Sequence, residues 1–249
     1  MATSRKDLIG YLDEILKPES FDDYGPNGLQ VTGREEVRTV VTGVSAGLEL
    51  FERAAAEDAD LVLVHHGLLW EGPPTPLDLV AKRRLQVLFD HDTSLVAYHL
   101  PLDGHLEHGN NALLAQALGA VVTGPFAGGI GVTAEFATPL PASDLVGRVR
   151  SATDRDPLAV LAGPEQVRTV AIVSGGGQGY LPEAIVGGLD AFVTGEASER
   201  NFNEAREASI HFLAAGHYAT ETLGVQRLGE LLAARFGVRH VYIDVPNPI

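Results

Sequence analysis

The chain has 249 residues, enough for one large domain or two small ones, and 45% of them are hydrophobic. Its formal net charge is −15, from 18 basic and 33 acidic residues. This balance disfavours nucleic acid as the main partner, because phosphate contacts come from Lys and Arg. The absence of cysteine excludes disulfides, thiolate nucleophiles, iron–sulfur clusters and cysteine-type zinc sites.

The N-terminal segment reads as a helix of a globular domain. Ser4, followed by Leu8, Leu12 and Leu16, predicts a capped amphipathic helix. This segment lacks the apolar core of a signal peptide, and no apolar run in the chain approaches the ~20 residues of a membrane span. We therefore expect a cytoplasmic protein with no membrane partner.

Predicted strands and helices alternate through the first half of the chain. In chain order they are a strand at 37–44, a helix at 47–57, a strand at 61–65, a helix at 77–90, a strand at 95–98 and a helix at 110–118. This alternation indicates a largely parallel sheet covered by helices on both faces.

A Gly/Pro-rich segment at 124–129 interrupts the pattern and predicts a domain junction. Beyond it we predict strands near 130–136, 159–161, 169–174, 191–194, 210–214 and 241–245, with helices near 142–150, 181–187, 203–208 and 223–236. The fold class is therefore α/β, with two domains of mixed, largely parallel sheets. The expected domains are residues 1–125 and 126–249, and the C-terminal helix and strand are candidates to pack back on the first.

Histidines and acids gather after three of the predicted strands. His65 and His66 end one strand, Asp103 follows the next, and His217 and Glu221 follow a third. Ligands of open α/β sheets collect at the carboxyl ends of strands, so these side chains predict a metal site in the cleft between the two domains. Nitrogen and oxygen donors suit zinc, iron or manganese. Because five donors exceed one tetrahedral site, we expect two divalent ions per subunit.

The local spacing allows these roles. Neighbouring strand side chains point to opposite faces, so His65 and His66 can both bind metal only where the strand ends and bends, which Gly67 permits. His217 and Glu221, four residues apart, share a face if the last helix has begun. Any one of these histidines alone is more often a structural or surface residue than a ligand. Their joint position at strand ends favours the metal hypothesis.

Two further residues are candidates for proton transfer. Glu196 follows the strand at 191–194, and His99 ends the strand before Asp103. A solvent-exposed turn carboxylate is the alternative for Glu196, and an orienting or substrate-facing role is the alternative for His99. The glycine-rich loop at 174–179 is either an anion cradle or a plain tight turn. The remaining histidines are interpreted as structural or surface residues: His91, His105, His108, His211 and His240.

Together these motifs resemble one protein family, the Nif-three-like dinuclear-metal proteins, whose bacterial members are called GTP cyclohydrolase type 2 homologues. The resemblance runs from about residue 5 to the C-terminus, and the chain is similar to the short form without an inserted domain. The motifs that carry it are Pro26-Asn27-Gly28-Leu29-Gln30-Val31, His65-His66-Gly67, His99-Leu100-Pro101-Leu102-Asp103, Gly109-Asn110-Asn111-Ala112, Thr194-Gly195-Glu196, Gly216-His217-Tyr218-Ala219-Thr220-Glu221 and Asp244-Val245-Pro246-Asn247-Pro248.

The resemblance implies a homohexamer, a trimer of dimers, with a metal pair in each subunit. By position it implies that His66 and Asp103 bind one ion and that His65 and His217 bind the other, with Glu221 bridging. The leading hypothesis is a dinuclear metal-dependent hydrolase acting on a small molecule. Its GTP cyclohydrolase version opens the imidazole ring of a purine nucleotide and releases formate. The alternative is a noncatalytic metal-binding or regulatory scaffold hexamer.

Overall fold

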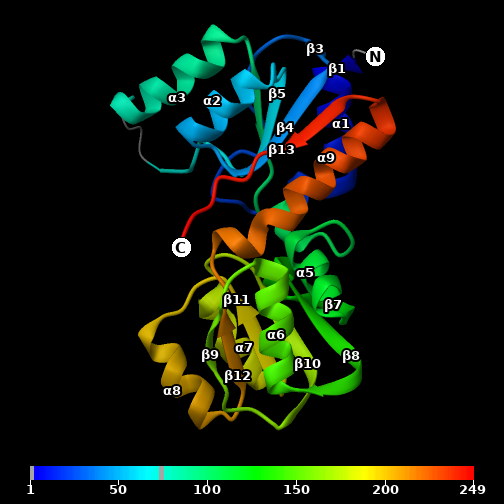
Figure 1. Cartoon of the computed structure of the whole chain (residues 1–249), viewed down its shortest axis with the longest axis vertical. Helices are drawn as coiled ribbons and strands as arrows, with labels where there is room; N and C mark the ends of the chain where they lie inside the picture. The colour runs from blue at the N-terminus through cyan, green and yellow to red at the C-terminus, as the bar shows by residue number, and fades with distance from the viewer. Residues whose placement is uncertain (1–2, 73–75) are drawn as a thin grey trace. The chain divides into compact units, whose positions relative to one another are not determined.

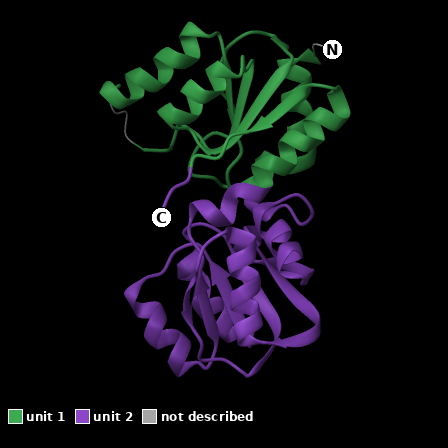
Figure 2. Ribbon diagram, in the orientation of Figure 1, with its two compact units in different colours: residues 1–102, 224–245 green, residues 103–223, 246–249 purple. Residues whose placement is uncertain are grey.

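The computed structural model describes residues 3–72 and 76–249, which fold into two compact units (Figure 2). Unit 1 takes its residues from 1–102 and 224–245, and unit 2 from 103–223 and 246–249. The chain passes from unit 1 to unit 2 within the short helix α4 (Leu100–Gly104). Among the described residues, no helix combines the length and the apolar character needed to cross a membrane.

Unit 1 is built on a five-stranded sheet with the strand order β13-β4-β5-β6-β2. Four of its strands form three parallel pairs, and β2 pairs antiparallel with β6. This sheet is therefore mixed and largely parallel, as predicted. The strands are β2 (Gly28–Val31), β4 (Thr39–Ser45), β5 (Leu61–His66), β6 (Ser94–Ala97) and β13 (Arg239–Tyr242), and a separate two-stranded sheet joins β1 (Thr3–Ser4) to β3 (Glu36–Val37).

Helices cover both faces of the unit 1 sheet (Figure 1). On one side lie α2 (Leu48–Ala56) and α3 (Leu79–Asp90), which pack against alternate strand residues in one core cluster. On the other side lie α1 (Arg5–Leu16) and α9 (Thr222–Phe236). The Ser4 hydroxyl accepts a hydrogen bond from the Asp7 amide at 3.0 Å, so α1 begins at the predicted cap. Strands covered on both faces explain the continuous apolar runs in the sequence.

Unit 2 contains a six-stranded sheet with the order β7-β8-β10-β11-β12-β9. Only β10–β11 and β11–β12 are parallel, and the other three pairs are antiparallel. The sheet is mixed, as predicted, but the expectation that it is largely parallel is wrong. The strands are β7 (Val121–Phe126), β8 (Gly131–Pro141), β9 (Leu158–Val160), β10 (Gln166–Val173), β11 (Ala191–Thr194) and β12 (His211–Ala214).

The helices of unit 2 form two layers around this sheet. Val170 and Ile172 of β10 join the core cluster that includes α5 (Asn110–Leu118) and α6 (Ala142–Thr153). The alternate residues Ala171 and Val173 join the cluster that includes α7 (Leu181–Val186) and α8 (Glu199–Glu207). Short 3₁₀ turns complete the chain: η1 (Pro18–Ser20), η2 (Ala127–Gly129), η3 (Gly177–Tyr180) and η4 (Tyr218–Glu221).

The two units do not coincide with the sequence segments 1–125 and 126–249. The Gly/Pro-rich segment at 124–129 lies inside unit 2, where it ends β7 and turns into β8. Pro125 is tolerated there because β7 is an edge strand. Such a strand has one neighbour, so the missing amide N–H of proline cannot remove a hydrogen bond to a second strand. Most of α9 and all of β13 belong to unit 1. The C-terminal tail returns to unit 2, where the Tyr218 amide donates to the Ile249 carbonyl at 3.2 Å.

Candidate functional site

Unit 1 brings three histidines together. His65 and His66 end β5, and His99 follows β6, the parallel neighbour of β5. One ring nitrogen of each lies within 4.8 Å of the other two. The ring centroid of His65 lies 4.5 Å from that of His66 and 5.0 Å from that of His99. The shared carboxyl edge of parallel strands therefore collects these rings, and His99 joins the pair that the sequence singled out.

Gly67 directly follows the end of β5, as predicted, and it also makes room for a neighbouring side chain. Strand β5 continues through His66, and Gly67 does not adopt the left-handed backbone conformation. A Cβ at this position would lie 2.3 Å from the side-chain amide of Gln30. The Gln30 Oε1 accepts hydrogen bonds from the amides of Leu68 at 2.7 Å and Leu69 at 3.2 Å. The glycine therefore admits a side chain that fixes the segment after the histidines.

His65 and His66 are both held through Nδ1. The Nδ1 of His65, which is fully buried, lies 3.0 Å from the Tyr98 carbonyl oxygen. Because a carbonyl only accepts, this nitrogen carries the proton and Nε2 is the basic nitrogen. The Nδ1 of His66 lies 3.1 Å from the Ser45 hydroxyl. Each imidazole can thus offer Nε2 to a metal while a neighbour fixes the orientation of its ring.

His99 is held by a carboxylate. Its Nδ1 lies 2.7 Å from the Asp23 Oδ1, while Asp23 Oδ2 accepts from the Asn27 side-chain amide at 2.8 Å and from the Leu100 amide at 2.9 Å. Burial acts to raise the pKa of Asp23, but the hydrogen bonds from His99 and Asn27 outweigh it and leave the pKa below its ordinary value. Asp23 is therefore ionised at neutral pH. Sequence reasoning missed it, because it follows no predicted strand.

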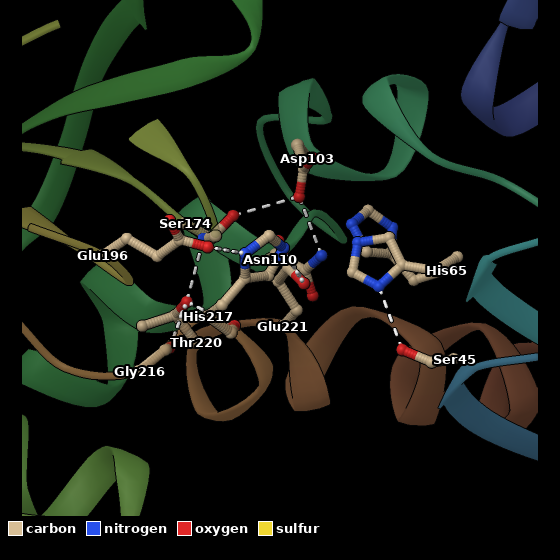
Figure 3. Close-up of polar contacts among 12 residues, drawn as sticks. Ser45, His65, Asp103, Asn110, Ser174, Glu196, Gly216, His217, Thr220 and Glu221 are labelled. Atoms are coloured by element: carbon tan, nitrogen blue, oxygen red, sulfur yellow. Dashed lines mark hydrogen bonds and ion pairs between the residues drawn. The ribbon is translucent and has the colours of Figure 1, made fainter. Parts of the chain in front are cut away.

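Unit 2 positions His217 between two carboxylates (Figure 3). Its Nδ1 lies 2.6 Å from the Glu196 Oε1, and its Nε2 lies 3.4 Å from the Glu221 Oε2. The four-residue spacing brings His217 and Glu221 together as predicted, although the segment is the 3₁₀ turn η4 rather than the start of an α-helix. Glu196 contacts the ring of His217, and the alternative of a plain exposed turn carboxylate does not hold.

Asp103 lies in a buried polar network of unit 2 (Figure 3). Its Oδ1 accepts hydrogen bonds from the Asn110 side-chain amide at 2.9 Å and from the Ser174 hydroxyl at 3.0 Å. The Asn111 side-chain amide donates to the backbone carbonyl of Asp103 at 3.2 Å. Sequence reasoning did not assign roles to Asn110 or Ser174. Two features of the sequence could have indicated these roles. Asn110 and Asn111 are adjacent at the start of α5, and Ser174 directly follows β10.

Gly175 allows the backbone to approach the two candidate ligands of η4. Its φ is +58°, and a Cβ there would lie 2.1 Å from the Glu221 Oε1 and 2.9 Å from the His217 Nε2. The Gly175 amide donates to the Thr220 hydroxyl at 3.0 Å, and its carbonyl accepts from the Glu196 amide at 3.0 Å. Both the left-handed φ and the close approach require glycine. These contacts give the start of the 174–179 loop a packing role beside the candidate ligands.

His211 has the structural role assigned to it from the sequence. It is buried, its Nδ1 accepts from the Gly163 amide at 3.2 Å, and its Nε2 lies 2.8 Å from the Pro164 carbonyl oxygen. Nε2 therefore carries the proton, the opposite tautomer to that of His65. Because both of its nitrogens are engaged by backbone groups, His211 is a suitable negative control for metal binding.

Comparison with known proteins identifies close relatives over the whole chain. A family model described as Duf34/NIF3 (NGG1p interacting factor 3) matches residues 3–248. A Pseudomonas aeruginosa protein named GTP cyclohydrolase 1 type 2 homolog is 46% identical over 252 residues, covering 100% of both chains. The Escherichia coli protein of the same name is 42% identical over 243 residues, covering 97% of this chain and 98% of the relative.

Solved structures share the fold. The protein ybgI, described as of unknown function, superposes with a TM-score of 0.95 at 40% identity, covering 99% of this chain and 100% of that one. A Thermus thermophilus protein, TTHA1606, gives 0.91 at 41% identity, with coverage of 99% and 100%. Reduced HcgD from Methanocaldococcus jannaschii gives 0.87 at 20% identity, with coverage of 98% and 99%, a likeness of fold alone.

Proposed function

The chain belongs to the Duf34/NIF3 family, as its motifs predicted, and from this premise we propose that it is a dinuclear metal-dependent hydrolase. The proposed ligands are His65, His66, Asp103, His217 and Glu221. The ions are two divalent metals per subunit, of the zinc, iron or manganese class.

The observation that carries the proposal is how the histidines are held. The Nδ1 of His65 meets the Tyr98 carbonyl, and the Nδ1 of His217 meets the Glu196 carboxylate. Metal-binding histidines characteristically engage their second nitrogen with a carbonyl or carboxylate, which fixes the tautomer and directs the other nitrogen to the ion. The buried His211 differs, because the nitrogen opposite its carbonyl contact accepts a hydrogen bond from the Gly163 amide.

The donor chemistry fits a pair of divalent ions. Three imidazoles and two carboxylates are the nitrogen and oxygen ligands that such metals accept, and the chain has no thiolate to compete. Five donors shared by two ions leave coordination positions for water and substrate, as catalytic sites require and closed structural sites do not. When bound, a metal pair lowers the pKa of water and polarises the substrate.

The chain's own residues supply orientation and proton transfer. Asp23 holds His99 through Nδ1, which leaves Nε2 of His99 to accept or donate a proton. Glu196, a proton-transfer candidate from the sequence, contacts the ring of His217 and acts through it as a positioning residue. His99 is thus the better proposal for the acid–base group.

For the substrate we propose a purine nucleotide opened at its imidazole ring with release of formate. The support is the name that relatives at 39–46% identity carry, GTP cyclohydrolase 1 type 2 homolog. The net charge of −15 argues against strong binding of a triphosphate. The phosphate contacts are therefore a minor part of the proposed recognition.

The test is an activity screen of metal-reconstituted protein. Zinc-, manganese- and iron-loaded samples are incubated with GTP, cyclic nucleotides and phosphoesters, and formate and phosphate are measured. Metal-dependent turnover that a chelator abolishes is the expected result. Full metal loading without turnover on any of these compounds would contradict the hydrolase proposal and favour a noncatalytic metal-binding or scaffold protein.

We also propose the homohexamer that the family resemblance implies. Light scattering in about 0.15 M salt, which screens surface charges beyond ~8 Å, should report roughly six times the 26.4 kDa mass of the chain. A stable monomer across micromolar concentrations would contradict this proposal.

A further inference from the structure

Trp70, the single tryptophan of the chain, lies exposed beside the histidine cluster of unit 1. Its ring centroid lies 5.1 Å from that of His99, with the planes at 87°, and 6.1 Å from that of His66. The ring of Tyr24 lies 6.2 Å from His99. Trp70 and Tyr24 are 46% and 65% exposed. Two large aromatic side chains therefore lie beside the same imidazole and are partly exposed to solvent.

The two backbone segments that carry these rings contact each other directly. The Glu71 amide donates to the Tyr24 carbonyl at 2.6 Å, which joins the two segments directly. A Cβ on Gly25 would lie 2.5 Å from the Leu69 carbonyl oxygen, so the segments touch at a distance that only glycine allows. The Leu69 amide is in turn bound by Gln30. Groups fixed in this way lose little conformational freedom when a ligand binds.

An isolated exposed apolar side chain is ordinary on a protein surface, but these are not isolated. Leu69, which is 50% exposed, precedes Trp70, and Tyr24 is joined to the same segment. Trp and Tyr offer large rigid surfaces that favour planar partners. The net charge of −15 makes recognition of a ligand through its ring more favourable than recognition through phosphates.

We propose that Trp70 and Tyr24 form a stacking platform for a planar heteroaromatic ring of the purine class. The platform places the ring beside His99, the group proposed for proton transfer. This inference rests on the proposed function in taking the bound ring to be the substrate's base. Unit 1 thus recognises the base of the substrate through Trp70 and Tyr24.

The single tryptophan provides a direct readout of binding. Guanosine, which has the base but no phosphate, is titrated into the wild-type protein while the tryptophan fluorescence is followed. Saturable quenching is expected. Ribose 5-phosphate, which has no base, should leave the fluorescence unchanged. Quenching by both compounds alike, or by neither, would overturn the proposal.

Variants measured by calorimetry identify the residue responsible. Trp70→Ala should weaken guanosine binding by roughly 5- to 150-fold, the range that corresponds to base–aromatic stacking of about 1–3 kcal/mol. Trp70→Phe keeps a ring and should lose much less. Phe89→Ala is the matched control, because Phe89 is an exposed aromatic residue of α3 in the same unit. Equal affinities of wild type and Trp70→Ala, both folded by circular dichroism, would refute the platform.

Parallel assays keep this proposal separate from the hydrolase proposal. Guanosine binding that depends on Trp70, in protein that hydrolyses no nucleotide, would preserve the platform and remove the enzyme. Nucleotide turnover that is unchanged in kcat and KM by Trp70→Ala would preserve the enzyme and remove the platform. A single-stranded oligonucleotide that binds far more tightly than guanosine would overturn the small-molecule assignment.

Discussion

The two units offer different chemistry at their candidate ligands. Unit 1 supplies imidazoles only, from His65 and His66, whereas unit 2 supplies the carboxylates of Asp103 and Glu221 with one imidazole. The unit 1 donors end a parallel strand, whereas His217 precedes a 3₁₀ turn and Glu221 is its last residue. Among the candidate ligands, the carboxylates therefore belong to unit 2, and unit 1 contributes imidazole nitrogens.

The means of holding the donors differ in the same way. In unit 1 a backbone carbonyl and a hydroxyl orient His65 and His66. In unit 2 a carboxylate orients His217, and Glu221 is 2% exposed. Burying a carboxylate costs free energy unless cations or hydrogen bonds compensate it. We therefore expect metal binding to depend most strongly on Glu221 of unit 2.

The largest expected effect follows from the proposed bridging role of Glu221. Glu221→Ala should reduce the bound metal from about two ions per chain to below one, because the bridging role that the family resemblance implies would have its carboxylate serve both ions. Asp103→Ala should retain about one ion. Elemental analysis after chelation and reconstitution with zinc, manganese or iron measures both.

Two further variants test whether the difference between the units is real. His65→Ala removes a neutral donor of unit 1 and should leave about one ion, whereas His211→Ala should leave the metal content of the folded protein intact. The comparison fails if His65→Ala depletes metal as fully as Glu221→Ala. If His211→Ala depletes it as much as His217→Ala, the assignment of His217 is wrong.

A pair of glycine variants isolates the packing around Glu221. Gly175→Ala would place a Cβ 2.1 Å from the Glu221 Oε1, whereas the Cβ of Gly128→Ala would have no neighbour within 4 Å. The φ values are similar, +58° and +68°, so both variants should lose about 1–2 kcal/mol of stability from left-handed strain. Only Gly175→Ala should also lose metal. Equal metal content in the two variants would show that Glu221 tolerates the displacement.

The hydrogen-bond partners of the histidines provide a smaller effect. Glu196→Ala should weaken metal binding by roughly 10–100-fold, the usual consequence of removing a carboxylate that orients a ligating histidine. Glu196→Gln keeps an acceptor oxygen and should lose less. Ser45→Ala, which removes a neutral partner of His66, should have the smallest effect of the three. Competition with a chromogenic chelator gives the metal affinities. A larger loss of affinity for Ser45→Ala than for Glu196→Ala would contradict the expected order of the two units.

The sequence predicted most elements of both units, but it missed β2 of unit 1 and β7 of unit 2. Buried parallel strands such as β5 read as continuous apolar runs, and helix α5 matches its predicted range of 110–118. Strand β7 was read as a break because Gly124 and Pro125 interrupt its pattern. That interruption is compatible with an edge strand, but edge position depends on long-range pairing, which periodicity does not encode.

The same distinction applies to the candidate site. The contact of His217 with Glu221 follows from their spacing in the sequence, and that of His65 with His66 from their adjacency at a strand end. Asp23 contacts a ring 76 positions away, so neither spacing nor periodicity could indicate it. The separation of Ser174 from Asp103, 71 positions, hides that partner for the same reason. Local spacing identifies candidate ligands, whereas the groups that orient them come from tertiary structure.

The smallest expected effect concerns pH and should be confined to unit 1. His240 of β13 has its Nε2 2.8 Å from the Thr42 hydroxyl. Burial lowers its pKa below the ordinary 6.5, against an opposing effect of Glu230. The unfolded chain therefore binds more protons than the folded one below about pH 6.5, and the stability due to neutral His240 is lost as the pH falls through that range.

In His240→Gln, which keeps a polar side chain, the midpoint of thermal unfolding should fall less steeply with acidification. Amide exchange should locate the difference in β13 and β4, which pair with each other in unit 1. Parallel pH profiles for wild type and variant, or a loss of protection that begins in unit 2, would show that His240 does not set this dependence.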